Sequence, residues 1–148
     1  IIPCKRRFYP QEGVKRAAEN MVTQSERVLA EDPSNAAALG IGAGGLAILG
    51  QAERATEWIE RALLIDPENW NMRYNFACVT AVYLNDPDGA IDLLEPVLTK
   101  VTVSLYRNAM FDTDLDGLRE IPRFQKMMAG AAKRLGVEPP ANAIPAAT

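Results

Sequence analysis

A ten-residue phrase occurs twice in this chain, and the second copy begins 34 positions after the first. Both copies, at residues 26–35 and 60–69, read Glu-Arg, any residue, Leu, two further residues, Asp-Pro, any residue and Asn. A repeat of this period is typical of proteins built from stacked helical units, none of which buries its apolar face alone. The repeat therefore predicts an all-α chain of stacked helix pairs, which offers a surface for a partner rather than a deep catalytic pocket.

The composition agrees with one soluble domain. The chain has 148 residues with a net charge of −3, and no run reaches the roughly 18 to 20 apolar residues of a membrane-spanning helix. The basic residues 5–7 are not followed by the apolar stretch of a signal peptide, and no basic face for nucleic acid is evident. We expect a cytoplasmic location, no membrane span and no nucleic-acid partner. Because the chain starts with Ile1, we also expect it to be a piece of a longer protein.

The residue types give little support for catalysis. The chain has no histidine, which removes the commonest general base and most zinc sites. Its cysteines, Cys4 and Cys78, lie too far apart in sequence for a metal knuckle or a redox pair, and free thiols fit a reducing compartment. We therefore expect no catalytic residues, no metal and no cofactor in this chain.

Turn and capping residues divide the sequence into helices. They predict helices over residues 11–30, 36–49, 52–65, 70–84 and from 87 onward, because the residue before a proline is pushed out of the α region. Pro96 inside the last of these predicts a kink or an early end near Leu98. A further helix is predicted over 122–135, closed by Gly136. Residues 1–10 are predicted to be a linker, and 136–148 a disordered tail.

The first complete repeat, residues 36–69, resembles the tetratricopeptide (TPR) pattern. The small, apolar, turn and closing positions of that pattern fall on Ala43, Leu46, Gly50, Ala55, Ile59, Ala62 and Pro67. Residues 70–100 fit with one residue inserted before Ala90, and residues 11–30 resemble the second half of an earlier repeat. The resemblance implies a right-handed α-solenoid of about two and a half repeats over residues 11–135, with a capping helix at 121–135.

Two phrases carry a more particular resemblance. Tyr-Asn-Phe-Ala-Cys at 74–78, followed by Asp-Thr-Asp-Leu-Asp-Gly-Leu-Arg-Glu-Ile-Pro-Arg-Phe at 112–124, resembles bacterial TPR regions fused behind class III adenylate or guanylate cyclase domains. Related regions stand behind serine/threonine kinase or TolB-like modules. The resemblance implies a regulatory or dimer-supporting module in signal transduction. The fragment itself is then not an enzyme, although its parent would be one.

Two sequence motifs partly match known ligand-binding patterns. Residues 40–45 satisfy the glycine pattern of dinucleotide-binding loops, but an alanine-rich helix start precedes them where a strand is required. We interpret these glycines as small residues on a closely packed helix, at a cost of roughly 1 kcal/mol each relative to alanine. Residues 112–117 open like an EF-hand loop, but Arg123 stands at its twelfth position, where calcium needs a bidentate acid. We expect one of these aspartates to cap a short turn instead.

The TPR pattern places its binding face on the first helix of each pair. That face maps to Ala37, Gly40, Gly44, Ile48, Asn71, Arg73, Tyr74, Cys78 and Val82. Relatives that hold a peptide's terminal carboxylate use lysine, arginine and asparagine there, whereas this chain has Gly40 and Gly44. A small, mostly apolar groove suits an aliphatic helix or a second copy of the module better.

Two functions from different classes follow. The first is a non-catalytic module that self-associates or docks onto its own upstream catalytic domain. The alternative is an adaptor whose groove binds a short segment of an unrelated protein.

Overall fold

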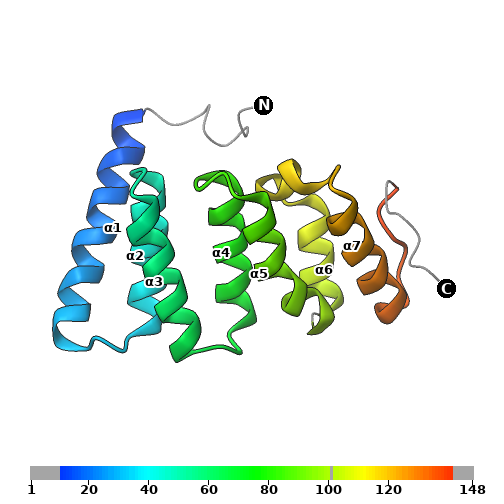
Figure 1. Cartoon of the computed structure of the whole chain (residues 1–148), viewed down its shortest axis with the longest axis horizontal. Helices are drawn as coiled ribbons and strands as arrows, with labels where there is room; N and C mark the ends of the chain where they lie inside the picture. The colour runs from blue at the N-terminus through cyan, green and yellow to red at the C-terminus, as the bar shows by residue number, and fades with distance from the viewer. Residues whose placement is uncertain (1–10, 101, 142–148) are drawn as a thin grey trace.

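The computed structural model describes residues 11–100 and 102–141, and every regular element in these ranges is a helix (Figure 1). The linker predicted at residues 1–10 and most of the predicted tail, residues 142–148, lie outside the described residues. The elements are α1 (Gln11–Glu31), α2 (Ala36–Ile48), α3 (Ala52–Ile65), α4 (Trp70–Val82), α5 (Pro87–Lys100), α6 (Val103–Phe111), the 3₁₀ helix η2 (Thr113–Leu118) and α7 (Pro122–Leu135). Among the described residues, no helix combines the length and apolar character that crossing a membrane requires.

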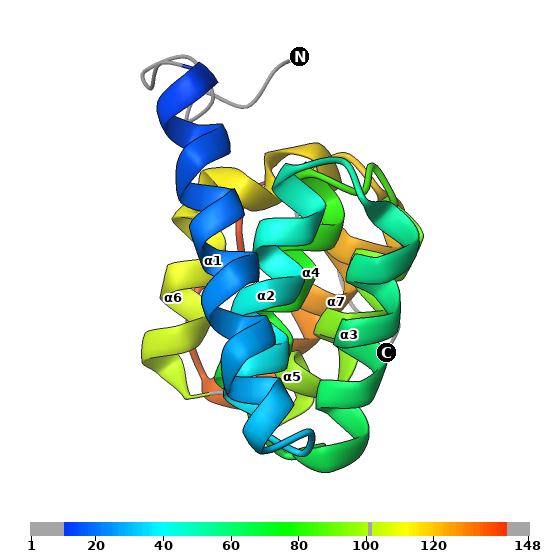
Figure 2. The same ribbon diagram turned by 90° about the vertical axis from the view of Figure 1, so that its left-hand side faces the viewer.

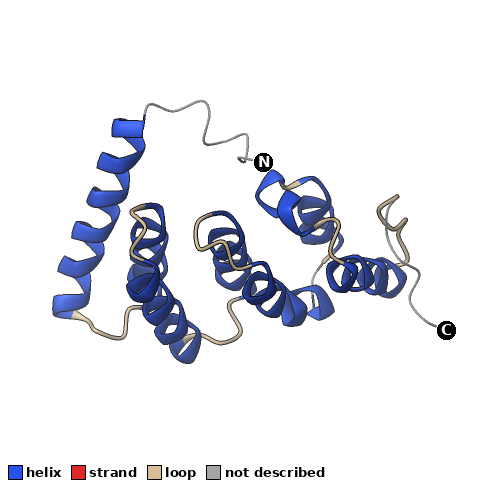
Figure 3. Cartoon of the chain, turned by 45° about the horizontal axis from the view of Figure 1, so that its top comes forward, coloured by secondary structure: helices blue, strands red, loops and turns tan. Residues whose placement is uncertain are grey.

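The helices lie side by side along the long axis of the molecule (Figure 1). Helix α1 packs on α2, α2 packs on α3, and α4 packs on α5, while α2 also contacts α4 across the boundary between pairs. Viewed along the axis from the α1 end, α3 lies on one side of the row and α6 on the other (Figure 2). Short loops join α1 to α2, α2 to α3, α3 to α4 and α4 to α5 (Figure 3).

The repeated Asp-Pro-x-Asn phrase ends one helix and caps the next. In the first copy the side chain of Asn35 accepts a hydrogen bond from the backbone N–H of Ala38 at 2.9 Å. In the second copy Asn69 accepts one from the N–H of Met72 at 3.0 Å. Each bond satisfies an N–H group that a helix start leaves without a partner within the helix. The two copies therefore cap the following helix in the same way, and they set where α2 and α4 begin.

Two glycines of α2 allow its neighbours to approach closely. A methyl group added at Gly42 would overlap the ring of Trp58 from α3. At Gly45 it would lie 2.8 Å from the carbonyl oxygen of Ala18 and 3.0 Å from a methyl group of Val22, both in α1. The prediction that small residues on this helix serve close packing is confirmed at these two positions.

The buried side chains form two clusters. One lies between α1, α2, α3 and α4 and includes Leu39, Leu46, Trp58 and Phe76. The other joins α4 and α5 to α6, η2 and α7 and includes Ile91, Leu94, Tyr106, Leu115 and Met128. Helix α4 contributes to both clusters, so it links the two halves of the molecule.

Several boundaries differ from the sequence prediction. Helix α5 does not end near Leu98 but continues to Lys100. Pro96 removes only one backbone hydrogen bond, and Val97 and Leu98, at 0% and 3% exposure, hold the last turn in the core. Helix α4 ends at Val82 rather than Leu84, followed by Asn85 in the left-handed region at φ 53°. Helix α6, which Thr102 caps, was not predicted.

The predicted closing helix is α7, which begins at Pro122 and ends before Gly136 at φ 68°. Arg123 at its start binds two carboxylates of α5, Asp92 at 2.6 Å and Glu95 at 2.8 Å. These ion pairs are exposed, so they orient the helix more than they stabilise it. Burial of Phe124 and Met128 supplies the apolar contact that holds α7 on the array.

The packing around Gly42 generates the first prediction. Gly42→Ala should lower the free energy of unfolding by about 1–3 kcal/mol, although alanine favours a helix, because the methyl group displaces Trp58. Urea denaturation measures the change. Gly13→Ala in α1, where an added methyl meets nothing within 4 Å, is the matched control and should not destabilise. Equal effects of the two substitutions would contradict the close approach of α2 and α3.

Candidate partner-binding groove

A groove of about 450 Å³ lies between α2 and α4, with Met21 of α1 at one side. Helix α2 lines it with small residues and one aliphatic side chain: Ala37, Gly40, Gly44 and Ile41. Helix α4 lines it with apolar Met72, Phe76 and Val79 and with Asn69, Asn71 and Asn75. The two helices hold equivalent places in successive copies of the repeat, so the groove lies on the boundary between units.

The groove is uncharged. Among the residues that the structure describes, every side chain that lines it is aliphatic, aromatic, a thioether or a neutral amide. Phe76 is 2% exposed, whereas Ile41 keeps 55% of its surface in solvent. The amides of Asn71 and Asn75 are exposed and hydrogen-bond to no other residue that the structure describes, whereas the amide of Asn69 bonds to Asp66 and its oxygen caps α4. The surface therefore combines an apolar interior with two available amides.

Four of the residues predicted for the binding face line this groove: Ala37, Gly40, Gly44 and Asn71. Ile48 lies instead at the other end of α2, in a smaller pocket with the first residues of α1. Arg73 is half-buried, and its guanidinium donates to the carbonyl oxygen of Pro67 at 3.3 Å. Val82 is half-buried at the last position of α4 and does not line the groove.

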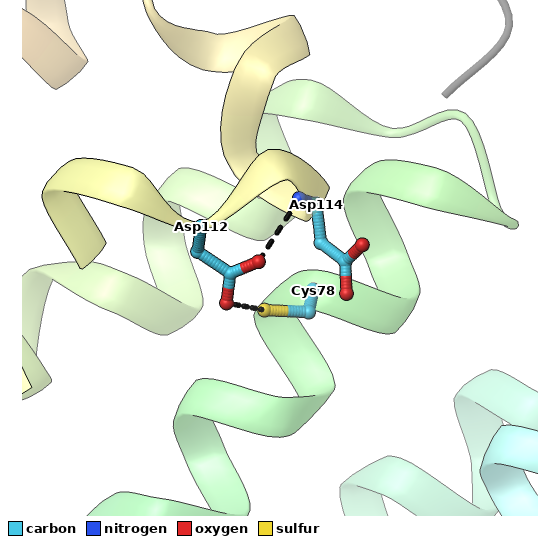
Figure 4. A group of neighbouring side chains, drawn as sticks. All are labelled: Cys78, Asp112 and Asp114. Atoms are coloured by element: carbon cyan, nitrogen blue, oxygen red, sulfur yellow. Dashed lines mark hydrogen bonds between the residues drawn. The ribbon is translucent and has the colours of Figure 1, made fainter. Parts of the chain in front are cut away.

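Tyr74 and Cys78 point away from the groove and into the core, with 4% and 9% exposure. The hydroxyl of Tyr74 donates to Oδ2 of Asp112 at 2.9 Å and accepts from the amide of Asn108 at 3.2 Å. The thiol of Cys78 lies 3.9 Å from the same carboxylate oxygen (Figure 4). The predicted placement of these two side chains on an open face is wrong, because Asp112 and the η2 helix that follows it cover that side of α4.

Asp112 fixes the start of η2. Its Oδ1 accepts the backbone N–H of Asp114 at 3.0 Å, so one aspartate does cap a short turn before the final helix, as predicted (Figure 4). The cap and the bond from Tyr74 together join α4 to η2, although they are separated by more than thirty positions in sequence. The cluster therefore anchors the C-terminal helices on the repeat.

Cys78, Asp112 and Asp114 have ligand atoms within 4.8 Å of one another, a spacing that a metal ion could use. Both oxygens of Asp112 already accept hydrogen bonds. Two further positions of the EF-hand pattern are also engaged, because Asp116 pairs with Arg119 and Arg123 pairs with Asp92 of α5. The arrangement supports a structural role for Asp112, and the absence of calcium binding stays a prediction.

Burial raises the pKa of the Tyr74 phenol, and the neighbouring Cys78 and Asp112 raise it further. Burial also raises the pKa of Tyr106, whose hydroxyl points toward the carbonyl oxygen of Glu138. Both phenols therefore stay protonated, as the hydrogen bond from Tyr74 to Asp112 requires.

Sequence reasoning missed seven lining residues: Met21, Ile41, Asn69, Met72, Asn75, Phe76 and Val79. A signal for three of them was present, since 72, 76 and 79 share one face of a helix at the spacing that places 37, 40, 41 and 44 on one face of α2. Met21 could not be found this way, because nothing in the repeat pattern places a side chain of α1 at the groove between α2 and α4.

The raised pKa values of Tyr74 and Tyr106 predict the alkaline behaviour of the fold. An unfolded tyrosine ionises near pH about 10. Because both values are raised on folding, the stability they contribute is complete below that pH and is lost as the pH rises above it. Urea denaturation from pH about 7 to about 11 should show this decline, and Asp112→Asn should let Tyr74 ionise at lower pH in tyrosinate absorbance. Full ionisation of all tyrosines in the native protein near pH about 10 would contradict the buried hydrogen bond.

Loss of the Asp112 carboxylate predicts a separate effect. Asp112→Ala should lower the free energy of unfolding by about 1–3 kcal/mol, because it removes the cap of η2 and the acceptor for the buried Tyr74 hydroxyl. Asp116→Ala, which removes an exposed carboxylate from the same turn, is the control and should change stability little. Chemical denaturation compares the two, and similar losses would argue against a special role for Asp112.

Comparison with known proteins finds no matching family model, no curated relative and no solved structure with significant similarity to this chain.

Proposed function

We propose that this chain is a non-catalytic protein-interaction module of TPR type, a right-handed α-solenoid of about two and a half repeats whose α2–α4 groove binds a polypeptide segment. The observation that carries the proposal is the uncharged, mostly apolar groove of about 450 Å³ between two helices in equivalent places of the repeat. The resemblance of residues 112–124 to cyclase-associated TPR regions suggests the setting. There the groove supports self-association or docking onto the catalytic domain of a cytoplasmic signalling protein such as an adenylate cyclase.

The groove has the character of a contact surface. An aliphatic side chain that is 55% exposed at the edge of an apolar concavity offers hydrophobic area that a partner can cover. The free amides of Asn71 and Asn75 lie beside it and can hydrogen-bond at the edge of such a contact. Binding there needs no rearrangement of the core, because the side chains that form the two clusters stay buried.

The same lining supports a non-catalytic role. Methionine, alanine, glycine, isoleucine, valine, phenylalanine and asparagine offer no group that exchanges a proton near neutral pH. Tyr74, whose pKa is shifted, faces away from the groove, and its shift keeps the phenol protonated rather than making it a base. Catalysis in the parent protein would then belong to another domain.

The charge of the groove also indicates which kind of polypeptide segment it binds. A peptide's terminal carboxylate is held by charge-assisted hydrogen bonds, and within residues 11–100 and 102–141 no arginine or lysine lines this groove to donate them. An internal or apolar segment suits it better. The adaptor function, in which that segment comes from an unrelated protein, uses the same residues and becomes the alternative outcome of the test.

Ile41→Glu tests the groove directly. Sedimentation equilibrium of the whole chain over a wide concentration range should show a dimer, which Ile41→Glu weakens by about tenfold or more because it places a carboxylate against apolar surface. Leu64→Glu is the matched control, since Leu64 is 82% exposed on α3 and lies outside the groove.

The same pair of variants in the full-length parent tests docking. Ile41→Glu should alter the activity of the catalytic domain, and Leu64→Glu should not. A strict monomer, together with a parent enzyme indifferent to Ile41→Glu, would contradict self-association and docking and leave only the adaptor function.

A further inference from the structure

The α2–α4 groove favours an uncharged occupant. Ile41 keeps 55% of its surface in solvent at the edge of the groove, and Phe76 forms part of its buried wall. No charged side chain of the described residues lines it. A charged group on the occupant would lose its water there without gaining a partner of opposite charge. The occupant therefore meets the groove with apolar and small side chains.

The end of this chain has that character. Residues 139–148 read Pro-Pro-Ala-Asn-Ala-Ile-Pro-Ala-Ala-Thr, and the last seven of them lie outside the described residues. None of the ten is charged, although 24% of the whole chain is. Residues 1–10, which also lie outside the described residues, carry three consecutive cations at positions 5–7 and so match the groove less well.

We propose that the groove holds residues 142–148 of a second copy of this chain, with the side chain of Ile144 against Ile41 and Phe76. This inference rests on the proposed function, because it names the occupant of the same groove. It gives self-association a definite contact, in which each of two molecules supplies one groove and one segment.

The length of the segment assigns it to a second molecule. The described part of the chain ends at Ala141, after α7, and Figure 1 places α5 and α6 between α7 and α4. Ile144 follows Ala141 by three residues, which span at most about 11 Å. Packed helices lie about 8–10 Å apart, so Ile144 reaches about one helix beyond α7. The groove of its own molecule is out of reach, and the groove of a neighbouring molecule is not.

Proline suits the segment to a groove between two helices. Pro145 has no N–H group to satisfy, and it favours an extended backbone at Ile144, because the residue before a proline is pushed out of the α region. The remaining peptide groups have the exposed amides of Asn71 and Asn75 within the groove. These amides lie one helical turn apart, about 6 Å, and alternate residues of an extended chain lie about 6.6 Å apart. The two amides therefore match alternate peptide groups of the segment.

The length of the groove fits a short contact of this kind. Its α2 wall runs from Ala37 to Gly44, which is a rise of about 10 Å. An extended chain covers that distance with about three residues. Ala143, Ile144 and Pro145 present one large aliphatic side chain between two compact ones.

Sedimentation equilibrium of whole-chain variants tests the segment. Ile144→Asp should weaken the dimer by about tenfold or more, as Ile41→Glu does, because it places a carboxylate against the same uncharged surface. Thr148→Asp is the matched control, since it adds the same charge four residues further along, and it should leave the association unchanged. Neither position belongs to the two buried clusters, so circular dichroism should show unchanged helix content in both variants.

An equal mixture of Ile41→Glu and Ile144→Asp chains identifies the two sides of the contact. Each variant alone has lost one side of every contact. In a mixed dimer the intact segment of the first chain meets the intact groove of the second. The mixture should therefore associate more tightly than either variant alone, and no recovery in the mixture would overturn the pairing of segment with groove.

Methionine methyl NMR locates the segment. An acetylated peptide of residues 139–148, added to the Ile144→Asp chain, should shift the methyl resonances of Met21 and Met72, which line the groove. The resonances of Met110, Met127 and Met128, which belong to the other half of the molecule, should not move. The same peptide with Ile144→Asp is the control and should shift none of them. Unchanged Met21 and Met72 with the first peptide would reject this occupant.

Failure of the inference is distinguishable from failure of the proposed function. A dimer that Ile41→Glu disrupts and Ile144→Asp leaves intact would overturn the segment as occupant and leave the groove as the contact between copies. A chain that stays monomeric at every concentration would overturn both the exchange of segments and self-association.

Discussion

Helix α2 lies so close to α1 and α3 that two of its positions accept only glycine. Gly42 faces the ring of Trp58, and Gly45 faces the backbone of α1. These contacts let α2 bury surface against both neighbours, with glycine at the two closest points. The spacing of the first pair, the position of Met21 and the shape of the groove beside α4 all follow from that approach. Larger residues at these two positions would hold α1 and α3 away from α2 and open the apolar cluster around Leu39 and Leu46.

The second half of the molecule depends on a polar contact instead. Asp112 caps η2 and accepts the hydroxyl of the buried Tyr74, so α4 is joined to a segment far along the chain. A hydrogen bond from a phenol to a carboxylate is stronger than one between two neutral groups. Since α4 packs α5 and the C-terminal helices with one face and α2 with another, the two halves share one rigid helix. The groove has a stable wall for that reason.

Much of the helical architecture could be predicted from the sequence. Helix α3 begins at Ala52 and ends at Ile65 as predicted, because glycine and Asp-Pro mark its ends. Helix α6 was missed, because it starts at Thr102 without a proline or glycine signal and the repeat pattern has faded there. On α2, the resemblance to the TPR pattern placed Ala37, Gly40 and Gly44 on one binding face. On α4 the same method selected Tyr74 and Cys78, because both sides of that helix are apolar and only η2 decides which side is covered. Such a long-range contact leaves no local pattern to find.

The groove places stability and binding in competition within one helix. Each glycine inside α2 costs roughly 1 kcal/mol relative to alanine, which is a noticeable fraction of the 5–15 kcal/mol that holds a typical domain folded. Gly42 and Gly45 offset that cost through the close helix contacts that they permit. No contact among the described residues is as close at Gly40 or Gly44. A partner that covers the exposed Ile41 would stabilise the fold, because binding to the folded state alone stabilises that state.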